Sequence, residues 1–300
     1  MRKIPVFVSL ALVGPSLLAT PLADATTPKP EKHGYVVNQL LVPTTNDQAR
    51  AYAFDIDKDG EVDNQLGYVF SVLASQGLDL QGAMDASIDS GAVVMLLSVQ
   101  TTSLTNAKGV KVRLLRGLPV ANPDLNGGGR FRVDKSAPRT ELKGKIKNRV
   151  LTTKPGAVSL SLPPLYPGFA AIPFDLLKGR IRGTCKTKRC TKGIIGGAIT
   201  SEDLDARFVP AIADMARAIV ARDCPTTPPD DCPPSTDGQT MLNLFDENDD
   251  KVITNDEVRE NPLIKTLLAP DLDVVGRDGV KDAMSVGFGF TARWAKIRGD

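Results

Sequence analysis

The chain has 300 residues, 42% of them apolar, 5% aromatic and 24% charged, and its formal net charge is +2. This composition is typical of a folded protein with room for two domains, and it excludes a small disulfide-stapled peptide and a wholly disordered chain. The only histidine is His33. Nucleophilic sites of the Ser-His-Asp and Cys-His types, HExxH zinc sites and histidine-rich metal centres all need an imidazole. The composition therefore argues against most familiar hydrolases and metalloenzymes.

Residues 1–25 have the pattern of a secretory signal peptide. A basic Met-Arg-Lys start is followed by an apolar run over residues 4–19, and Ala23-Asp24-Ala25 has the small-x-small pattern of a cleavage site. The alternative is a membrane anchor, but the run is shorter than the roughly 20 residues that cross a bilayer. We expect cleavage after Ala25, no membrane span once the signal is removed, and an exported protein that is periplasmic, at the cell surface or secreted.

Export favours disulfides for the four cysteines, because an even number at short spacings in an oxidising compartment is typical of disulfide pairing. We expect local pairing of Cys185 with Cys190 and of Cys224 with Cys232, although four cysteines allow three connectivities. Zinc binding is the alternative. Neither pair is a CxxC motif, however, and no histidine lies near them in the sequence.

The first part of the mature chain is predicted to be mixed. Residues 26–45 are expected to form a flexible leader that ends at Gly34 and a first strand that starts at Tyr35. Residues 46–90 have the pattern of two helices around an acidic loop, over 46–54 and 64–76. The second helix has one apolar face, formed by Leu66, Val69, Phe70 and Leu73.

Strands are predicted for the middle of the chain and helices for the rest. Residues 91–200 contain seven β-prone runs bounded by Gly, Pro and Asn, over 92–99, 109–115, 130–133, 142–151, 157–162, 174–181 and 193–199. Residues 201–300 are expected to be helical, with a helix over 201–222, a connector over 224–236, and a segment over 239–270 that a second acidic loop interrupts. The predicted fold class is α+β, with an antiparallel β-sandwich or barrel-like core flanked by helical units.

The second acidic loop, residues 246–257, is twelve residues long and carries oxygen-bearing side chains at regular intervals. A hard cation takes six to eight oxygen ligands, and this spacing wraps side chains, a carbonyl and a two-oxygen carboxylate around one point. The loop resembles an EF-hand loop, which makes the flanking segments EF-hand-like units and implies Ca²⁺ binding. The resemblance assigns the ligands Asp246, Asn248, Asp250, the Val252 carbonyl, Thr254 and Glu257, at positions 1, 3, 5, 7, 9 and 12.

Two further positions of this loop carry expectations. Lys251 stands at position 6, where Gly is usual because the chain turns there with a positive φ, so we expect a cost of roughly 1 kcal/mol and a weakened affinity. Ile253 stands at position 8, where EF-hands pair their loops, and helices are expected over 241–245 and 258–268. A solvated acidic turn between helices is the alternative.

The first acidic loop, residues 55–64, resembles the shorter DxDxDGxxD type of calcium loop. Its candidate ligands are Asp55, Asp57, Asp59, the Glu61 carbonyl and Asp63. Leu66 falls at position 12, so the bidentate ligand is missing; a purely structural Asp-rich turn remains the alternative, and Asp63 is either a ligand or the N-cap of the next helix. Residues 271–282 echo this loop, and we expect them to form a degenerate, metal-free partner of the hand at 246–257.

The predicted β region is basic, because residues 108–192 hold 20 Lys and Arg against 4 Asp and Glu. Over residues 142–151 the cations alternate with apolar residues and Gly, which predicts a basic strand face formed by Lys143, Lys145, Lys147 and Arg149; Arg180 and Arg182 repeat the arrangement. Such a face can bind an acidic glycan or another polyanion. The alternative is a solvated, lysine-rich sheet face that discourages edge pairing. The region has few aromatic residues and no dedicated nucleic-acid motif.

The sequence therefore predicts an exported calcium-binding protein that acts as a non-catalytic binding or structural module of the cell envelope or extracellular space, with Ca²⁺ as its ligand. One alternative is a secreted carboxylate-dependent polysaccharide hydrolase, for which Asp134 and Glu141 are a candidate pair. The other alternative is a polyanion-binding protein that uses the basic β face.

Overall fold

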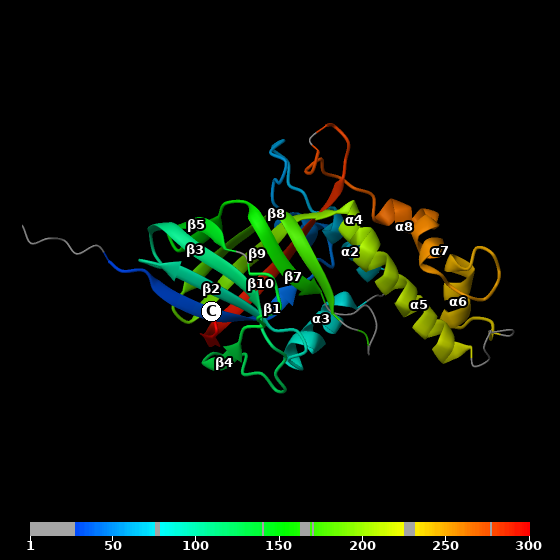
Figure 1. Ribbon diagram of the computed structural model, residues 1–300, viewed down its shortest axis with the longest axis horizontal. Helices are drawn as coiled ribbons and strands as arrows, with labels where there is room; N and C mark the ends of the chain where they lie inside the picture. The colour runs from blue at the N-terminus through cyan, green and yellow to red at the C-terminus, as the bar shows by residue number, and fades with distance from the viewer. Residues whose placement is uncertain are drawn as a thin grey trace, which may run out of the picture.

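Eight strands form a closed antiparallel barrel in the computed structural model, which describes residues 28–75, 79–139, 141–162, 169, 171–224, 232–276 and 278–300 (Figure 1). The predicted signal peptide lies outside these residues. Pairing of the first and last strands closes the ring. In ring order the strands are β1 (Glu31–Leu41), β2 (Met95–Thr101), β3 (Ala107–Arg116), β5 (Leu142–Lys147), β6 (Val150–Thr153), β8 (Ile172–Lys186), β9 (Arg189–Thr200) and β10 (Ala283–Arg298).

Two short strands lie outside this ring. β4 (Gly129–Arg132) runs parallel to the end of β10, and β7 (Gly156–Leu162) pairs with the first half of β8. The β4 segment covers a second apolar cluster on the barrel wall, in which Phe131 packs with Leu96, Leu115 and other buried residues. β4 therefore shields part of the outer wall from water, whereas β7 adds Val158, Leu160 and Leu162 to the main hydrophobic core.

Apolar side chains fill the barrel because alternate residues of each strand point inward. Tyr35 and Phe290 are among the largest of these fully buried side chains. The Tyr35 hydroxyl donates a hydrogen bond to the Lys186 carbonyl at 3.0 Å, and burial raises the pKa of this phenol to about 12. The same core cluster continues into the helices, so the barrel and the helices share one hydrophobic interior.

Three helices follow β1: α1 (Asn46–Ala51), α2 (Gln65–Ser75) and α3 (Leu80–Asp89). The apolar face predicted for the second helix is confirmed, because Leu66, Val69 and Phe70 are buried. The Phe70 ring lies 6.1 Å from the ring of Phe288 in β10, so α2 packs directly on the barrel.

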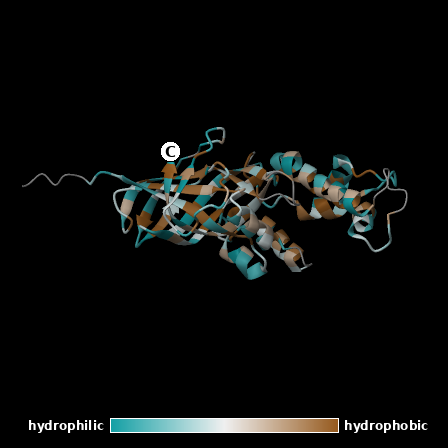
Figure 2. Cartoon of the chain, turned by 90° about the horizontal axis from the view of Figure 1, so that it is seen from below, coloured by the Kyte–Doolittle hydropathy of each residue, from teal (hydrophilic) through white to brown (hydrophobic). Residues whose placement is uncertain are grey.

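The remaining helices extend away from the barrel and make the molecule elongated (Figure 2). They are α4 (Ser201–Asp203), the π-helical segment η1 (Leu204–Phe208), α5 (Val209–Asp223), α6 (Asp237–Phe245), α7 (Asn255–Glu260) and α8 (Pro262–Leu267). Phe208 anchors this group, since its ring lies 5.7 Å from that of Phe174 in β8. Among the residues described, no helix combines the length and the apolar character needed to cross a membrane.

The predicted α+β class with a barrel-like core is confirmed, but several elements differ from the prediction. β1 begins at Glu31, inside the predicted leader, and residues 283–298, which we expected to be helical, form the long strand β10. The first half of β10 is buried on both faces. Gly287 and Gly289 allow this burial because Tyr52 lies directly against them on the outside of the barrel. A Cβ on Gly287 would come within 2.1 Å of the Tyr52 carbonyl oxygen. The predicted strand over 142–151 is a hairpin, since Asn148 and Arg149 turn the chain with φ of 50° and 66°.

Candidate metal centres

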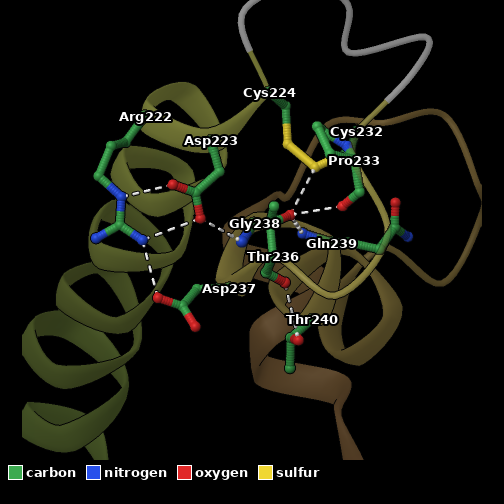
Figure 3. A network of polar contacts seen from close by, with 10 residues as sticks. All are labelled: Arg222, Asp223, Cys224, Cys232, Pro233, Thr236, Asp237, Gly238, Gln239 and Thr240. Atoms are coloured by element: carbon green, nitrogen blue, oxygen red, sulfur yellow. Dashed lines mark hydrogen bonds and ion pairs between the residues drawn. A yellow bond between two sulfur atoms is a disulfide. The ribbon is translucent and has the colours of Figure 1, made fainter.

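A network at the second disulfide fixes the start of α6 on the end of α5 (Figure 3). Cys224 and Cys232 are bonded, as are Cys185 and Cys190 at the β8–β9 hairpin, so the local pairing expected for both disulfides is confirmed. The Asp223 carboxylate accepts a hydrogen bond from the Gly238 amide at 2.9 Å. Hydrogen bonds, first from Arg222 and then from Gly238, lower the pKa of Asp223 to about 2.

This junction is tight. A Cβ on Gly238 would lie 2.8 Å from the Cys224 sulfur, so a larger residue would push α6 off α5. Thr236 caps α6 by accepting from the Gln239 amide at 3.2 Å. The disulfide, the carboxylate and the cap together hold α6 as the entering helix of the second acidic loop.

The loop at residues 246–257 winds around its own carboxylates. Asp246 accepts hydrogen bonds from the amides of Asp250 and Lys251 at 3.1 and 3.0 Å, and Asp250 accepts from Val252 at 2.8 Å. Asn248 accepts from the Asp250 amide at 2.9 Å. Carboxylate oxygens of Asp246, Asp250 and Glu257 lie within 4.8 Å of one another, so three of the predicted ligands converge.

Glu257 uses its two carboxylate oxygens differently. Oε2 accepts from the amide and the hydroxyl of Thr254 at 2.8 and 2.9 Å, while Thr254 accepts from the Glu257 amide, which makes a capping box at the start of α7. Oε1 is buried and has no hydrogen-bond partner among the residues that the structure describes. A buried carboxylate oxygen without a donor is costly, so Oε1 is an acceptor whose partner is missing.

Lys251 has the positive φ expected at position 6, with a value of 65°. Its ammonium group contacts Asp249, and this contact, followed by the charge of Asp246, raises the pKa of Lys251. The lysine therefore adopts the turn that the loop requires and brings a positive charge beside the acidic residues.

Ile253 was expected to pair with another loop, but the structure places it against α5. Its side chain is buried, and its carbonyl accepts a hydrogen bond from Arg217 of α5 at 2.8 Å. On the exiting side, Arg259 of α7 bonds to Asp205 of η1 at 2.7 Å. The second acidic loop and its flanking helices therefore pack as a single unit on the long helix η1–α5.

The exiting helix differs from the one predicted over 258–268. It is divided into α7 and α8 at Asn261, whose ψ of 125° interrupts the helix. Pro262 is the cause, because a residue before proline avoids the helical region and proline suits the first position of a new helix.

In the first acidic loop, carboxylate oxygens of Asp55, Asp57 and Asp63 lie within 4.8 Å of one another. Asp59 lies outside this triad, where it accepts from the Glu61 amide at 2.8 Å. Asp63 turns back to accept from the Ile56 amide at 2.6 Å. The pKa of Asp63 is raised to about 6, mainly by burial and further by the negative charges of Asp57, Asp271 and Asp59. The hydrogen bond from the Ile56 amide acts in the opposite direction and lowers this pKa.

Sequence reasoning missed Asn64, and this residue caps α2 in place of Asp63. Its side-chain oxygen accepts from the Gly67 amide at 3.1 Å, and its amide group donates to the carbonyls of Ala49 and Gly287 at 2.8 and 3.1 Å. The signal was present, because Asn just before an apolar helical pattern is a preferred N-cap. Asn64 therefore connects the first acidic loop to both α1 and β10.

Residues 271–282 do not pair with the hand at 246–257 as expected. The described residues of this segment form a loop that leads into β10, and Leu272 and Val274 pack with Ile56 of the first acidic loop and with Phe54 just before it. Figure 1 shows the two loops projecting side by side from the barrel, in blue and orange-red. The short connection from α8 to β10 brings this segment back to the barrel wall.

The basic face is partly as predicted. Lys143, Lys145 and Lys147 point outward from β5, between the inward-facing Leu142 and Ile146, whereas Arg149 lies in the hairpin turn and does not extend the stripe.

Each carboxylate of the candidate catalytic pair is bonded to partners of its own. Asp134 bonds to Ser136 and Arg116, Glu141 bonds to Arg113, and these contacts lower the pKa of each carboxyl group. Each carboxylate is thus held in its ionised form, the opposite of what a general acid requires.

Comparison with known proteins gives no family for this chain. No protein-family model matches it, and no curated protein and no solved structure matches it significantly. The EF-hand resemblance therefore depends on the residues of the two acidic loops.

Proposed function

We propose that this chain is an exported, non-catalytic calcium-binding protein whose main site is the loop at residues 246–257. The observation that carries the proposal is the buried Oε1 of Glu257, an acceptor without a donor that lies with the carboxylates of Asp246 and Asp250. A cation among these oxygens supplies the missing partner and cancels the repulsion between the carboxylates.

The chemistry of the ligands favours Ca²⁺. The candidate set consists of carboxylate, amide and carbonyl oxygens, with no nitrogen or sulfur ligand, and such sets suit hard cations. A flexible loop with a two-oxygen carboxylate at its end favours Ca²⁺ over Mg²⁺, which demands a near-ideal octahedron. The positive charge of Lys251 places the expected dissociation constant at about 10⁻⁵ to 10⁻³ M, the range of weaker sensors and extracellular sites.

A structural role follows from where the loop lies. It joins α6 and α7, both of which pack on α5, so a bound cation stabilises the outer end of the helical part. The two disulfides are typical of an oxidising, extracellular type of environment, and the expected affinity is in the range of extracellular calcium sites.

The test is thermal unfolding and calcium titration of the chain without residues 1–25. Calcium at a hundred times the dissociation constant is expected to add about 2.7 kcal/mol of stability. Glu257→Gln is expected to abolish most of this gain, because it removes a charge and half of the bidentate ligand. Glu260→Gln, an equal charge change on the exposed end of α7, is the matched control and is expected to retain the gain.

An unchanged melting temperature in calcium relative to calcium-free buffer would contradict the proposal. An equal loss of the calcium-dependent stability gain in Glu257→Gln and Glu260→Gln would also contradict it. Stoichiometry tests the first acidic loop separately: two ions per chain, falling to one in Asp57→Asn, are expected if Asp55, Asp57 and Asp63 hold a second ion.

A further inference from the structure

A cleft of about 620 Å³ lies on the outer wall of the barrel, where β6 ends. The pairing of β6 with β8 stops at Thr152 and Arg182. Beyond this pair the Thr153 hydroxyl takes the place of a backbone acceptor for the Ile181 amide, at 2.9 Å, and the chain leaves toward β7. Side chains of β5, β6 and β8 line one side of the cleft, and the first acidic loop with the preceding Phe54 lines another.

Four cations line this cleft: Lys145, Lys154, Arg180 and Arg182. The strand registers place Lys145 opposite Thr152 and Thr152 opposite Arg182, so these two cations lie in one row across three strands, with Thr152 between them. Within the described residues, none of the four has a carboxylate at ion-pair distance, although one carboxylate, Asp55, also lines the cleft.

Arg180 carries the decisive observation. Its Nε is buried and has no hydrogen-bond acceptor. A charged N–H group that is removed from water without an acceptor costs free energy, so this position requires an oxygen that the described residues do not supply. Arg182 is oriented beside it, because its guanidinium lies 5.7 Å from the centre of the Phe54 ring.

We propose that this cleft binds a sulfate or phosphate monoester group on a sugar. A guanidinium presents a planar fork of N–H donors that matches two oxygens of such a group. The ammonium groups of Lys145 and Lys154 add positive charge and do not require a fixed hydrogen-bond geometry. The cleft is larger than one oxyanion, which leaves room for the sugar that carries the ester.

The site is distinct from the predicted stripe of Lys143, Lys145, Lys147 and Arg149. Those side chains are spread along an exposed strand and a turn, and among them the structure leaves no buried donor unpaired. In the cleft, by contrast, the cations converge on one space. Lys145 belongs both to the stripe and to the cleft, so the variants tested below do not include it.

The experiment is a calorimetric titration in calcium-depleted buffer at constant ionic strength, so that it does not depend on calcium at the main proposed site, the loop at residues 246–257. The probes are inorganic sulfate, inorganic phosphate, glucose 6-sulfate and glucose 6-phosphate. We expect saturable binding of one ester per chain, and the two sugar esters show which oxyanion is preferred.

Arg180→Gln and Arg182→Gln are each expected to weaken binding at least tenfold. Arg180→Lys is expected to weaken it several-fold as well, because it keeps the charge and loses the fork. The matched control is the double variant Lys188→Gln and Arg189→Gln, on the hairpin at the far end of β8, which is expected to change the affinity less than twofold.

Two results would overturn the proposal: no saturable binding by the unaltered chain, or an equal loss of affinity in the control, which would indicate a diffuse positive field. Circular dichroism and melting temperatures of all variants confirm that each is folded. Because no residue of the loop at 246–257 lines the cleft, failure of the titration leaves the main calcium site untouched, and the reverse also holds; Asp55 lines the cleft and belongs to the first acidic loop, so only that second ion is linked to it.

Discussion

Lys251 shows how one side chain sets the properties of a loop. It adopts a φ of 65°, which a residue with a Cβ rarely does, and it brings an ammonium group next to Asp249 and Asp246. We expect Lys251→Gly to bind calcium about tenfold more tightly, because the variant removes both the positive charge and the strain. Stability without calcium is expected to change by less than about 1 kcal/mol, since glycine also gains entropy in the unfolded chain.

Calcium titration of Lys251→Gln separates the two contributions to this effect. This variant loses the charge but keeps the Cβ, so it is expected to show part of the gain. If Lys251→Gly bound calcium no better than the unaltered chain, neither the charge nor the strain would limit the affinity.

Asp223 gives a pH dependence at the residue scale. Its pKa is about 2 in the folded chain and about 3.9 in an unfolded one, so its contribution to stability is complete above pH 4 and is lost as the pH falls toward 2. We expect the unaltered chain to lose stability over this window more steeply than Asp223→Asn. Urea unfolding at a series of pH values measures the difference, and parallel curves would contradict the prediction.

At the scale of elements, the two disulfides are expected to differ in their effect on calcium. Replacing Cys224 and Cys232 by Ser should cost about 2–3 kcal/mol of stability, because this disulfide closes a short loop, and should also weaken calcium binding through the freed start of α6. Replacing Cys185 and Cys190 by Ser at the β8–β9 hairpin should destabilise the barrel without changing calcium affinity. Equal calcium affinities in the two double variants would show that calcium binding does not depend on the Cys224–Cys232 disulfide at the start of α6.

Local patterns predicted most elements, and distant partners explain those that were missed. The alternation of Lys143, Lys145 and Lys147 with inward residues gave β5 correctly, and the periodicity of Leu66, Val69 and Phe70 gave α2. β10 was missed because glycines interrupt its pattern, and the reason for those glycines is Tyr52, more than 200 residues away in the sequence.

The candidate metal ligands were predictable because their spacing lies within twelve residues, and the structure brings Asp246, Asp250 and Glu257 together. The partners of the loops were not predictable, because spacing along the chain carries no information about which surface a loop meets. Ile253 contacts α5, and residues 271–282 lie on the first acidic loop.

At the scale of the whole molecule, the small net charge is the sum of a basic part and an acidic part that nearly cancel. The barrel carries most of the cations, the helical part beyond residue 200 is acidic, and the loops at residues 55–64 and 271–282 lie against the barrel wall. Asp55 lines the same cleft as Arg180 and Arg182 without forming an ion pair with them, so the acidic loop does not neutralise the cations beside it.

The pairing of β1 with β10 closes the ring between distant parts of the chain. Thr291 meets Gln39 across 252 residues of chain, and slow folding is expected of so distant a contact. The Asn64 side chain holds the first acidic loop on Gly287 of that same strand. Any ion that Asp55, Asp57 and Asp63 bind selectively in the folded chain is therefore expected to stabilise the closed barrel as well as the loop.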